Sequence, residues 1–221
     1  MNHNILYSFR RCPYAIRARW ALLNTNQVVV LREVELKNKP LELIQISKKA
    51  TVPVLKTSLN KVIDESLEIM IWSIKRSNRH ELFGNNNENS KEIFSLIETN
   101  DKVFKYHLDR FKYASRFDFE ESSGHRAAAM KILLYLNNRL KEFSNEGKPL
   151  FLVDAKETLA DWAIWPFVRQ FRIADIKKFD QNNEIKYLRC WLNYFFTHEK
   201  YPIVMKKNEP WSKKNEPLFF G

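Results

Sequence analysis

Cysteine is scarce in this sequence, and long hydrophobic runs are absent from it. The two cysteines, Cys12 and Cys190, are too few for a disulfide framework and too far apart to form a metal-binding pair. The longest apolar runs, such as 27–31 and 150–153, are far too short to span a bilayer. The first residues contain neither an apolar signal core nor a small-residue cleavage site. These absences predict a cytoplasmic protein in a reducing compartment, with no metal and no membrane partner.

The charge of the chain is strongly basic, with a formal net charge of +11. Hydrophobic residues make up 44% of the chain and charged residues 29%, which is typical of a globular protein. A basic chain raises the question of a nucleic-acid partner. The lysines and arginines are spread along the sequence, however, and no known nucleic-acid motif occurs. We therefore expect ordinary surface charge and no nucleic-acid partner.

The first third of the chain alternates between strand and helix patterns. Its strands are short apolar or β-branched runs, and its helices place apolar residues three or four positions apart. This order is βαβαββα, in which strand–helix–strand implies a parallel pair with a right-handed crossover. The predicted segments are strands at 5–8 and 28–36, helices at 13–23, 40–46 and 66–76, and a hairpin of 52–55 with 61–63.

The rest of the chain shows only helical periodicity. Residues 80–89 are polar and predict a linker. Beyond them, apolar residues at helical spacing predict an all-α domain. The fold class is therefore an α/β domain at 1–79 followed by an all-α domain at 90–221. The predicted helices of the second domain are 93–111, 125–143, 159–173 and 185–196.

Cys12 lies where the first predicted strand gives way to the first helix. Pro13 marks the first helical position, because its fixed φ and missing N–H cost nothing there. Cys12 then becomes the N-cap, with its sulfur beside unpaired N–H groups and the positive end of the helix dipole. Arg10, Arg11 and Arg17 add positive charge. Such settings lower a cysteine pKa from about 8.5 to roughly 3.5–7.5, so we expect a reactive thiolate.

The chemistry at Cys12 would use a single thiol. Ala15 stands where a Cys-X-X-Cys site would carry its second cysteine. A mixed disulfide would therefore form on Cys12, and a second thiol from solution would resolve it. The alternative is a small buried cysteine with a structural role at the start of a helix.

Two further segments suit the binding of a peptide-like ligand. Pro53 opens a predicted strand, which indicates either an edge proline or a cis peptide bond. A cis bond would leave the N–H and C=O of Val52 available to an extended ligand. Ser66 can cap the following helix, whose N–H groups attract a carboxylate, and Glu65 could accept hydrogen bonds from an ammonium group. An ordinary acidic helix cap is the alternative for Glu65 and Ser66.

These three segments, in this order, resemble the glutathione transferase superfamily. The closest likeness is to its cysteine-type members, the omega class and related bacterial glutaredoxin-like proteins. Cys-Pro-Tyr-Ala at 12–15, Thr-Val-Pro-Val-Leu at 51–55 and Asp-Glu-Ser at 64–66 carry the resemblance. It covers essentially the whole chain, and it implies a thioredoxin-like domain followed by an all-helical domain. It also implies that glutathione is a substrate or co-substrate.

The resemblance implies a role for five residues. Cys12 would face the glutathione sulfur, and the backbone of Val52, beside a cis proline, would pair with the cysteinyl part. Glu65 and Ser66 would hold the γ-glutamyl end. Lys39 would lie near the glycyl carboxylate, although a solvated lysine is the alternative. The site for a second substrate stays unassigned.

Four other residues are predicted to be structural. Tyr7 falls inside the first strand, so we expect it to be packed rather than to activate glutathione. Thr158 and Asp161 precede an apolar run and form a predicted capping box that stabilises a helix. Cys190 is predicted to be a buried structural cysteine.

The leading functional hypothesis is a glutathione-dependent thiol transferase that acts on a small disulfide through Cys12. The first alternative, in the same fold, is conjugation of glutathione to a small electrophile. The second is a non-catalytic partner protein that resembles the stringent starvation proteins. A homodimer is left open.

Overall fold

The chain forms two compact units in a computed structural model that describes residues 3–113, 122–144 and 149–221. The sheet unit consists of Met1–His80 and Glu199–Gly221, and the helical unit consists of Glu81–His198. A mixed α/β unit and a helical unit were predicted, and the fold class is confirmed.

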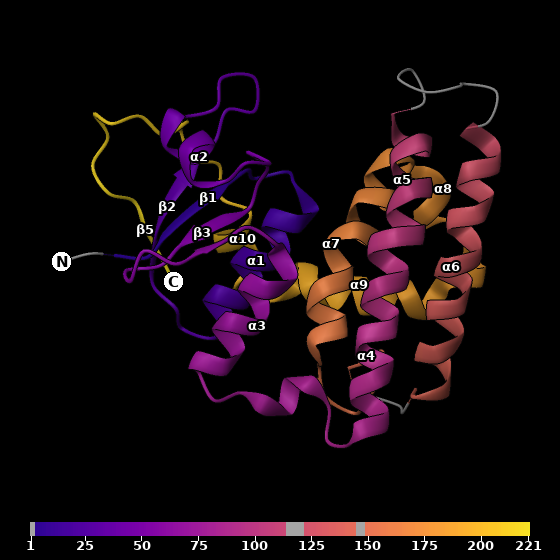
Figure 1. Ribbon diagram of the computed structural model, residues 1–221. Helices are drawn as coiled ribbons and strands as arrows, with labels where there is room; N and C mark the ends of the chain where they lie inside the picture. Colours follow the sequence, from indigo (N-terminus) through magenta and orange to yellow (C-terminus); the bar gives the residue numbers. More distant parts are fainter. Residues whose placement is uncertain (1–2, 114–121, 145–148) are drawn as a thin grey trace. The chain divides into compact units, whose positions relative to one another are not determined.

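The sheet unit follows the predicted βαβαββα order and then adds two elements from the end of the chain (Figure 1). Strand β1 and helix α3 have the predicted bounds, and the other elements differ by a few residues at their ends. The elements are β1 (Ile5–Ser8), α1 (Pro13–Asn24), β2 (Val29–Glu33), α2 (Leu41–Ile46), β3 (Val54–Lys56), β4 (Val62–Ile63), α3 (Ser66–Arg76), α10 (Tyr201–Val204) and β5 (Phe219–Phe220).

The strands form one mixed sheet in the order β4-β3-β1-β2-β5. The central pair, β1 and β2, is parallel, with Leu6 opposite Leu31, as the strand–helix–strand order predicts. On the other side of β1, Leu6 lies opposite Leu55 of the antiparallel strand β3. Helices α1 and α3 pack side by side on one face of the sheet, and α2 lies on the other face (Figure 1).

Helix α1 lies at the centre of the hydrophobic core of the sheet unit. Most of its apolar residues, among them Ile16 and Trp20, are fully buried, and burial of each such side chain stabilises the fold by about 1.5–3 kcal/mol. Arg17 and Arg19, which lie mostly off the predicted apolar stripe, are also buried, at 2% exposure each. The helix is therefore enclosed on nearly all sides, and both guanidinium groups need partners inside the protein.

The end of the chain belongs to the sheet unit, which differs from the predicted helical domain at 90–221. Strand β5 pairs with β2, and Val29 lies opposite Phe220. The N–H of Trp211 donates to the C=O of Glu33 at 2.8 Å. The guanidinium of Arg32 lies 3.9 Å from the centroid of the Trp211 ring. The final segment thus covers one edge of the sheet.

The helical unit contains every predicted helix of the second domain, with one interruption and some additions (Figure 1). The predicted helix at 93–111 is divided by a π-helical turn. The predicted linker at 80–89 holds a 3-10 turn at His80–Phe83 and the start of α4. The elements are α4 (Asn87–Thr99), the π turn η2 (Asn100–Phe104), α5 (Lys105–Lys112), α6 (Ser122–Glu142), α7 (Leu159–Ala174), α8 (Ile176–Asp180), the 3-10 turn η4 (Asn183–Ile185) and α9 (Lys186–Thr197).

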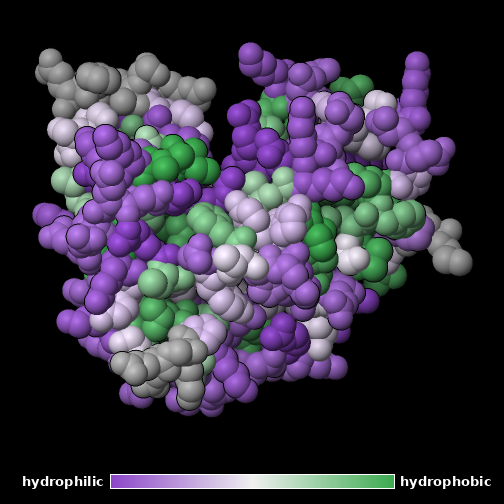
Figure 2. Space-filling model, turned by 180° about the vertical axis from the view of Figure 1, so that it is seen from behind, coloured by the Kyte–Doolittle hydropathy of each residue, from purple (hydrophilic) through white to green (hydrophobic). Residues whose placement is uncertain are grey.

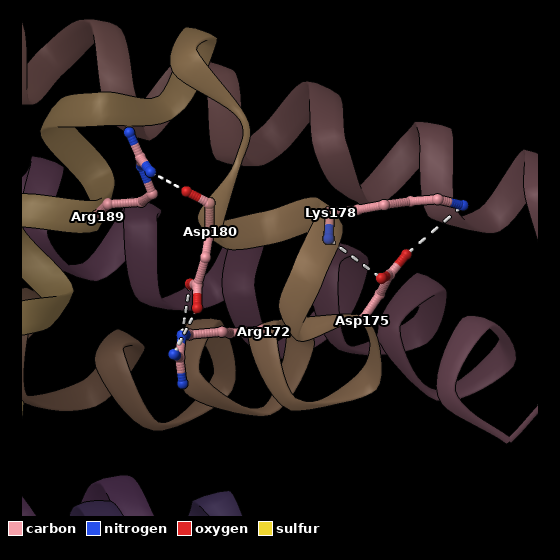
Figure 3. Close-up of polar contacts among 5 residues, drawn as sticks. All are labelled: Arg172, Asp175, Lys178, Asp180 and Arg189. Atoms are coloured by element: carbon pink, nitrogen blue, oxygen red, sulfur yellow. Dashed lines mark hydrogen bonds and ion pairs between the residues drawn. The ribbon is translucent and has the colours of Figure 1, made fainter.

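The corner between α7 and α8 is held by ion pairs (Figure 3). Arg172 donates from Nε and Nη2 to the two carboxylate oxygens of Asp180, at 2.7 and 2.6 Å. Arg189 of α9 donates to the backbone C=O of Asp180. Asp175 caps α8 by accepting from the N–H of Lys178 at 3.3 Å. This bidentate pair fixes the turn more firmly than a single hydrogen bond would, because two parallel N–H donors of Arg172 hold both oxygens of the carboxylate.

Asp161 is the buried polar centre of the helical unit. Together with Thr158 it forms the predicted capping box at the start of α7. Its carboxylate accepts from Thr158 N–H at 2.8 Å, Leu152 N–H at 2.9 Å and Trp191 Nε1 at 2.9 Å. Burial raises the pKa of Asp161 to about 6, and the donated hydrogen bonds oppose this rise. The carboxylate therefore joins the loop before α7 to α7 itself and to α9.

The face of the molecule drawn in Figure 2 is largely hydrophilic. Figure 2, which views the molecule from behind, shows hydrophobic residues in small groups among hydrophilic ones. Within the described ranges, every helix is too short or too polar to cross a membrane.

Replacement of Asp161 should cost more stability than loss of the cap alone. Thr158→Ala should lower the free energy of unfolding by about 0.5–2 kcal/mol, as for other N-caps. Asp161→Ala leaves several buried donors without an acceptor and should cost roughly 3 kcal/mol or more. Urea denaturation at neutral pH would measure both. Asp175→Ala, which removes a more exposed helix cap, is the matched control and should cost about 1 kcal/mol or less. An equal loss for Asp161→Ala and Asp175→Ala would contradict the central role of Asp161.

Candidate functional site

Cys12 is the N-cap residue of α1, as predicted. Its backbone is extended, with φ −75° and ψ 122°, and Pro13 follows as the first helical residue. The C=O of Cys12 accepts the N–H of Ile16 at 2.8 Å, which begins the helical hydrogen-bond pattern. The side chain makes no capping hydrogen bond, so Sγ lies beside the helix start without being used to close it.

Val52 faces Cys12 across the site. The Sγ of Cys12 lies 3.6 Å from the backbone C=O of Val52. The peptide bond between Val52 and Pro53 is cis, which decides between the two predicted alternatives. The structure therefore brings together two segments that are distant in sequence, and it places a backbone carbonyl next to the thiol.

Two electrostatic effects oppose each other at the sulfur. The N-terminus of α1, whose first turn contains no acidic residue, favours the thiolate. The Val52 C=O favours the thiol instead, because only an S–H can donate to a carbonyl oxygen. A ligand that occupies the Val52 C=O with a donor of its own would remove the second effect and leave the first.

The loop before Cys12 is fixed from two sides. Arg19 donates to Ser8 Oγ, to the C=O of Arg10 at 2.9 Å and to the C=O of Val204 at 3.0 Å. The buried carboxylate of Glu33 accepts the N–H of Arg10 at 2.7 Å. Burial raises the pKa of Glu33, and the Arg10 N–H and the charge of Arg19 oppose the rise. These contacts hold the backbone that leads into the N-cap.

The start of α3 differs in detail from the prediction. Glu65 is the N-cap residue and Ser66 is the first helical residue, so the prediction that Ser66 caps the helix is wrong. Ser66 is buried, and its Oγ accepts the Nε–H of Arg17 at 3.0 Å. The Glu65 carboxylate pairs with the ammonium of Lys49 at the surface. A buried hydroxyl and an exposed carboxylate thus stand next to each other at a helix N-terminus.

Lys39 is partly exposed in the loop that precedes α2. Within the described part of the chain, no hydrogen bond or ion pair joins Lys39 to Cys12, Val52, Glu65 or Ser66. By contrast, the Sγ of Cys12 contacts the backbone C=O of Val52 directly.

The sequence patterns missed the residues that support the site. Arg17 was predicted only to add positive charge near Cys12, and its burial and its contact with Ser66 were not predicted. The buried contacts of Arg19 and Glu33 were not predicted either. Cys190 was predicted to be buried, and it is exposed. Tyr7 is packed as predicted, at 2% exposure, and its hydroxyl accepts from Arg32 at 2.5 Å. Among the described residues, no group of three or more His, Cys, Asp and Glu side chains could hold a metal ion.

Known proteins share this architecture. Residues 6–79 match a family model described as glutathione S-transferase, N-terminal domain. A Tau class glutathione S-transferase from mango, Mangifera indica, is 21% identical, with a TM-score of 0.78 and 93% of each chain covered. Glutathione transferase Omega 3C from Trametes versicolor is 19% identical, with a TM-score of 0.75, covering 96% of this chain and 87% of that one. Ure2p, the yeast prion protein, in complex with glutathione, is 15% identical, with a TM-score of 0.76 and coverage of 92% and 98%.

The chain accordingly has the glutathione transferase fold. The range 6–79 that matches the glutathione S-transferase N-terminal model includes Cys12, Val52, Glu65 and Ser66. No curated protein sequence matches the chain. The cysteine-type subclass and the roles of the individual site residues stay predictions.

Cys12 should ionise at a lower pH than Cys190. The helix N-terminus stabilises a thiolate at Cys12, whereas Cys190 is an exposed residue inside α9. The rate of iodoacetamide labelling against pH, measured on Cys12→Ser and Cys190→Ser, reports each thiol separately. The midpoint for Cys12 should lie clearly below that for Cys190. Midpoints rather than rates are compared because Cys12 is less exposed. A Cys12 midpoint at or above that of Cys190 would remove the basis for a reactive thiolate.

Proposed function

We propose that this chain is a glutathione-dependent thiol transferase whose nucleophile is the Cys12 thiolate. The observation that carries the proposal is the position of Cys12 at the N-cap of α1, 3.6 Å from the backbone C=O of Val52. A helix N-terminus supports a thiolate, and an adjacent backbone group can align a peptide-like thiol or disulfide with it. The match to a glutathione S-transferase N-terminal domain supports glutathione as that ligand.

The reaction needs one protein thiol and two molecules of glutathione. The Cys12 thiolate attacks the glutathione sulfur of a mixed disulfide, the S–S bond breaks, and the substrate leaves as a thiolate that takes up a proton. Cys12 then carries a disulfide to glutathione. The thiolate of a second glutathione attacks the glutathione sulfur of that disulfide, which releases oxidised glutathione and restores the Cys12 thiolate. Ala15 offers no second thiol, so glutathione performs the resolving step. Reduced glutathione in the cytoplasm suits this cycle.

The other site residues bind the ligand in this proposal. The backbone of Val52 pairs with the cysteinyl part, and the Ser66 end of α3 receives the γ-glutamyl carboxylate. Glu65 receives the γ-glutamyl ammonium, and Lys39 approaches the glycyl carboxylate. The ammonium of Lys49 forms an ion pair with the Glu65 carboxylate, but both side chains are more than half exposed. Such exposed pairs contribute little to stability, so a ligand ammonium can replace Lys49 at little cost.

Conjugation of glutathione to a small electrophile is the second candidate function. The observation that favours it is the structural similarity to a Tau class glutathione S-transferase. A non-catalytic partner protein is the third candidate, and the observation behind it is the structural similarity to the nitrogen regulation fragment of Ure2p. A cysteine at position 12 favours thiol transfer over both, because it can form a disulfide with glutathione.

Oxidised glutathione should add one glutathione per chain, on Cys12, and a reducing thiol should remove it. Intact-mass measurement followed by peptide mapping would locate the adduct. Cys190→Ser should keep the adduct, since the exposed Cys190 is not the proposed nucleophile. Cys12→Ser should lose both the adduct and the reduction of a glutathionyl disulfide.

Conjugation of a chloronitrobenzene by the same variants separates the candidate functions. Retention of disulfide reduction in Cys12→Ser would rule out Cys12 as the nucleophile. Efficient conjugation by the wild-type protein without any disulfide reduction would make the conjugating transferase the correct description. If the wild-type protein binds glutathione but shows neither disulfide reduction nor conjugation, the non-catalytic partner protein is favoured.

A further inference from the structure

We infer that Arg17 is a positioning residue that prepares Ser66 to donate a hydrogen bond to an anionic group of the ligand. The inference rests on the proposed function, in which Ser66 meets the γ-glutamyl carboxylate. It assigns to a buried arginine on α1 a part in ligand selectivity, through a hydroxyl on α3.

The contact between the two side chains fixes the direction of the hydrogen bond. Arg17 Nε lies 3.0 Å from Ser66 Oγ. A guanidinium has donors and no acceptor, so Ser66 Oγ must be the acceptor. The proton of the Ser66 hydroxyl therefore points away from Arg17 and is available to another acceptor. Without Arg17, the same hydroxyl could rotate and use its proton on a nearby acceptor within the protein.

Charge and burial strengthen this effect. Arg17 and Ser66 are 2% and 4% exposed, so the hydrogen bond lies in a medium that screens charge weakly. A cationic donor polarises the hydroxyl and makes its proton a stronger donor in turn. Ser66 is also the first residue of α3, where N–H groups without helical partners attract an anion. Each of these effects favours a carboxylate over a neutral or cationic group.

Arg17 is held in place by its own surroundings. Its guanidinium lies 5.1 Å from the centroid of the Tyr14 ring, one turn earlier on α1. Because α1 also begins at Cys12, the same helix supports the nucleophile and, through Arg17, the proposed carboxylate subsite. The sulfur and the γ-glutamyl end of a bound glutathione would thus be aligned by a single helix.

A ligand that lacks only the carboxylate tests the inference. In 4-aminobutanoyl-cysteinyl-glycine, the γ-glutamyl carboxylate of glutathione is replaced by hydrogen. Titration calorimetry gives the dissociation constant of each ligand. The dissociation constant of the analogue divided by that of glutathione measures selectivity for the carboxylate. Hydrogen bonds to charged groups correspond to a ratio of about 10-fold or more in the wild-type protein. Arg17→Met and Ser66→Ala should each lower this ratio severalfold, mainly by weakening the binding of glutathione. The double variant should lower the ratio no further than Ser66→Ala alone.

Two more variants separate positioning from a structural role. Arg17→Lys keeps a cationic donor and should retain much of the selectivity. Arg76→Met, at the other end of α3, is the matched control and should leave the ratio unchanged. If Arg17→Met does not fold, Arg17→Gln replaces it. A neutral amide is a weaker donor than a guanidinium, so its ratio should fall between those of the wild type and Ser66→Ala.

The outcomes are distinct. A wild-type protein that does not bind glutathione overturns the proposed function and the inference with it. A wild-type protein that selects the carboxylate, and folded Arg17 variants that select it equally well, overturn the inference alone. If Arg17→Met weakens the binding of both ligands equally, Arg17 has a purely structural role, and the inference is also overturned.

Discussion

A buried guanidinium, that of Arg19, holds the loop on which the candidate site depends. Removing an arginine from water costs several kcal/mol unless its donors find partners. Arg19 meets this requirement by donating to the backbone oxygens of Arg10 and Val204 and to the hydroxyl of Ser8. The cost of leaving Arg19 unpaired therefore keeps the end of β1 in one conformation, and this loop leads directly into the N-cap at Cys12. A residue buried in α1 thus sets the position of Cys12.

Much of the fold could be predicted because local patterns and packing agree in this chain. Pro13 marks the start of α1, and the short apolar run at 5–8 predicted β1 with its observed bounds. The π turn at Asn100–Phe104 could not be predicted, because the same apolar spacing suits an uninterrupted helix. Strand β5 is equally hidden from sequence patterns, since two residues show no alternation and pair only with a strand already formed.

The candidate site was predictable where it depends on the backbone and not where it depends on long side chains. The N-cap position of Cys12 follows from the proline beside it, and the placement of Val52 near it follows from family motifs. Arg17 and Arg19 follow helical spacing that is typical of solvated residues, yet both are buried and donate to polar partners inside the protein. Ser66 and Glu65 are both acceptable caps, and only the observed backbone distinguishes them.

The division of the sheet unit into two segments has a consequence for synthesis on the ribosome. Residues 199–221 leave the ribosome after the whole of the helical unit, which lies between the two parts of the sheet unit in sequence. Helical segments with local contacts can fold during synthesis, as domains generally do. The edge of β2, however, cannot be covered until β5 has emerged. For most of the time that the chain is being made, β2 is an open strand edge, which is the kind of surface that recruits other chains. The sheet is therefore begun before the helical unit and completed after it, because its edge strand β5 is made last.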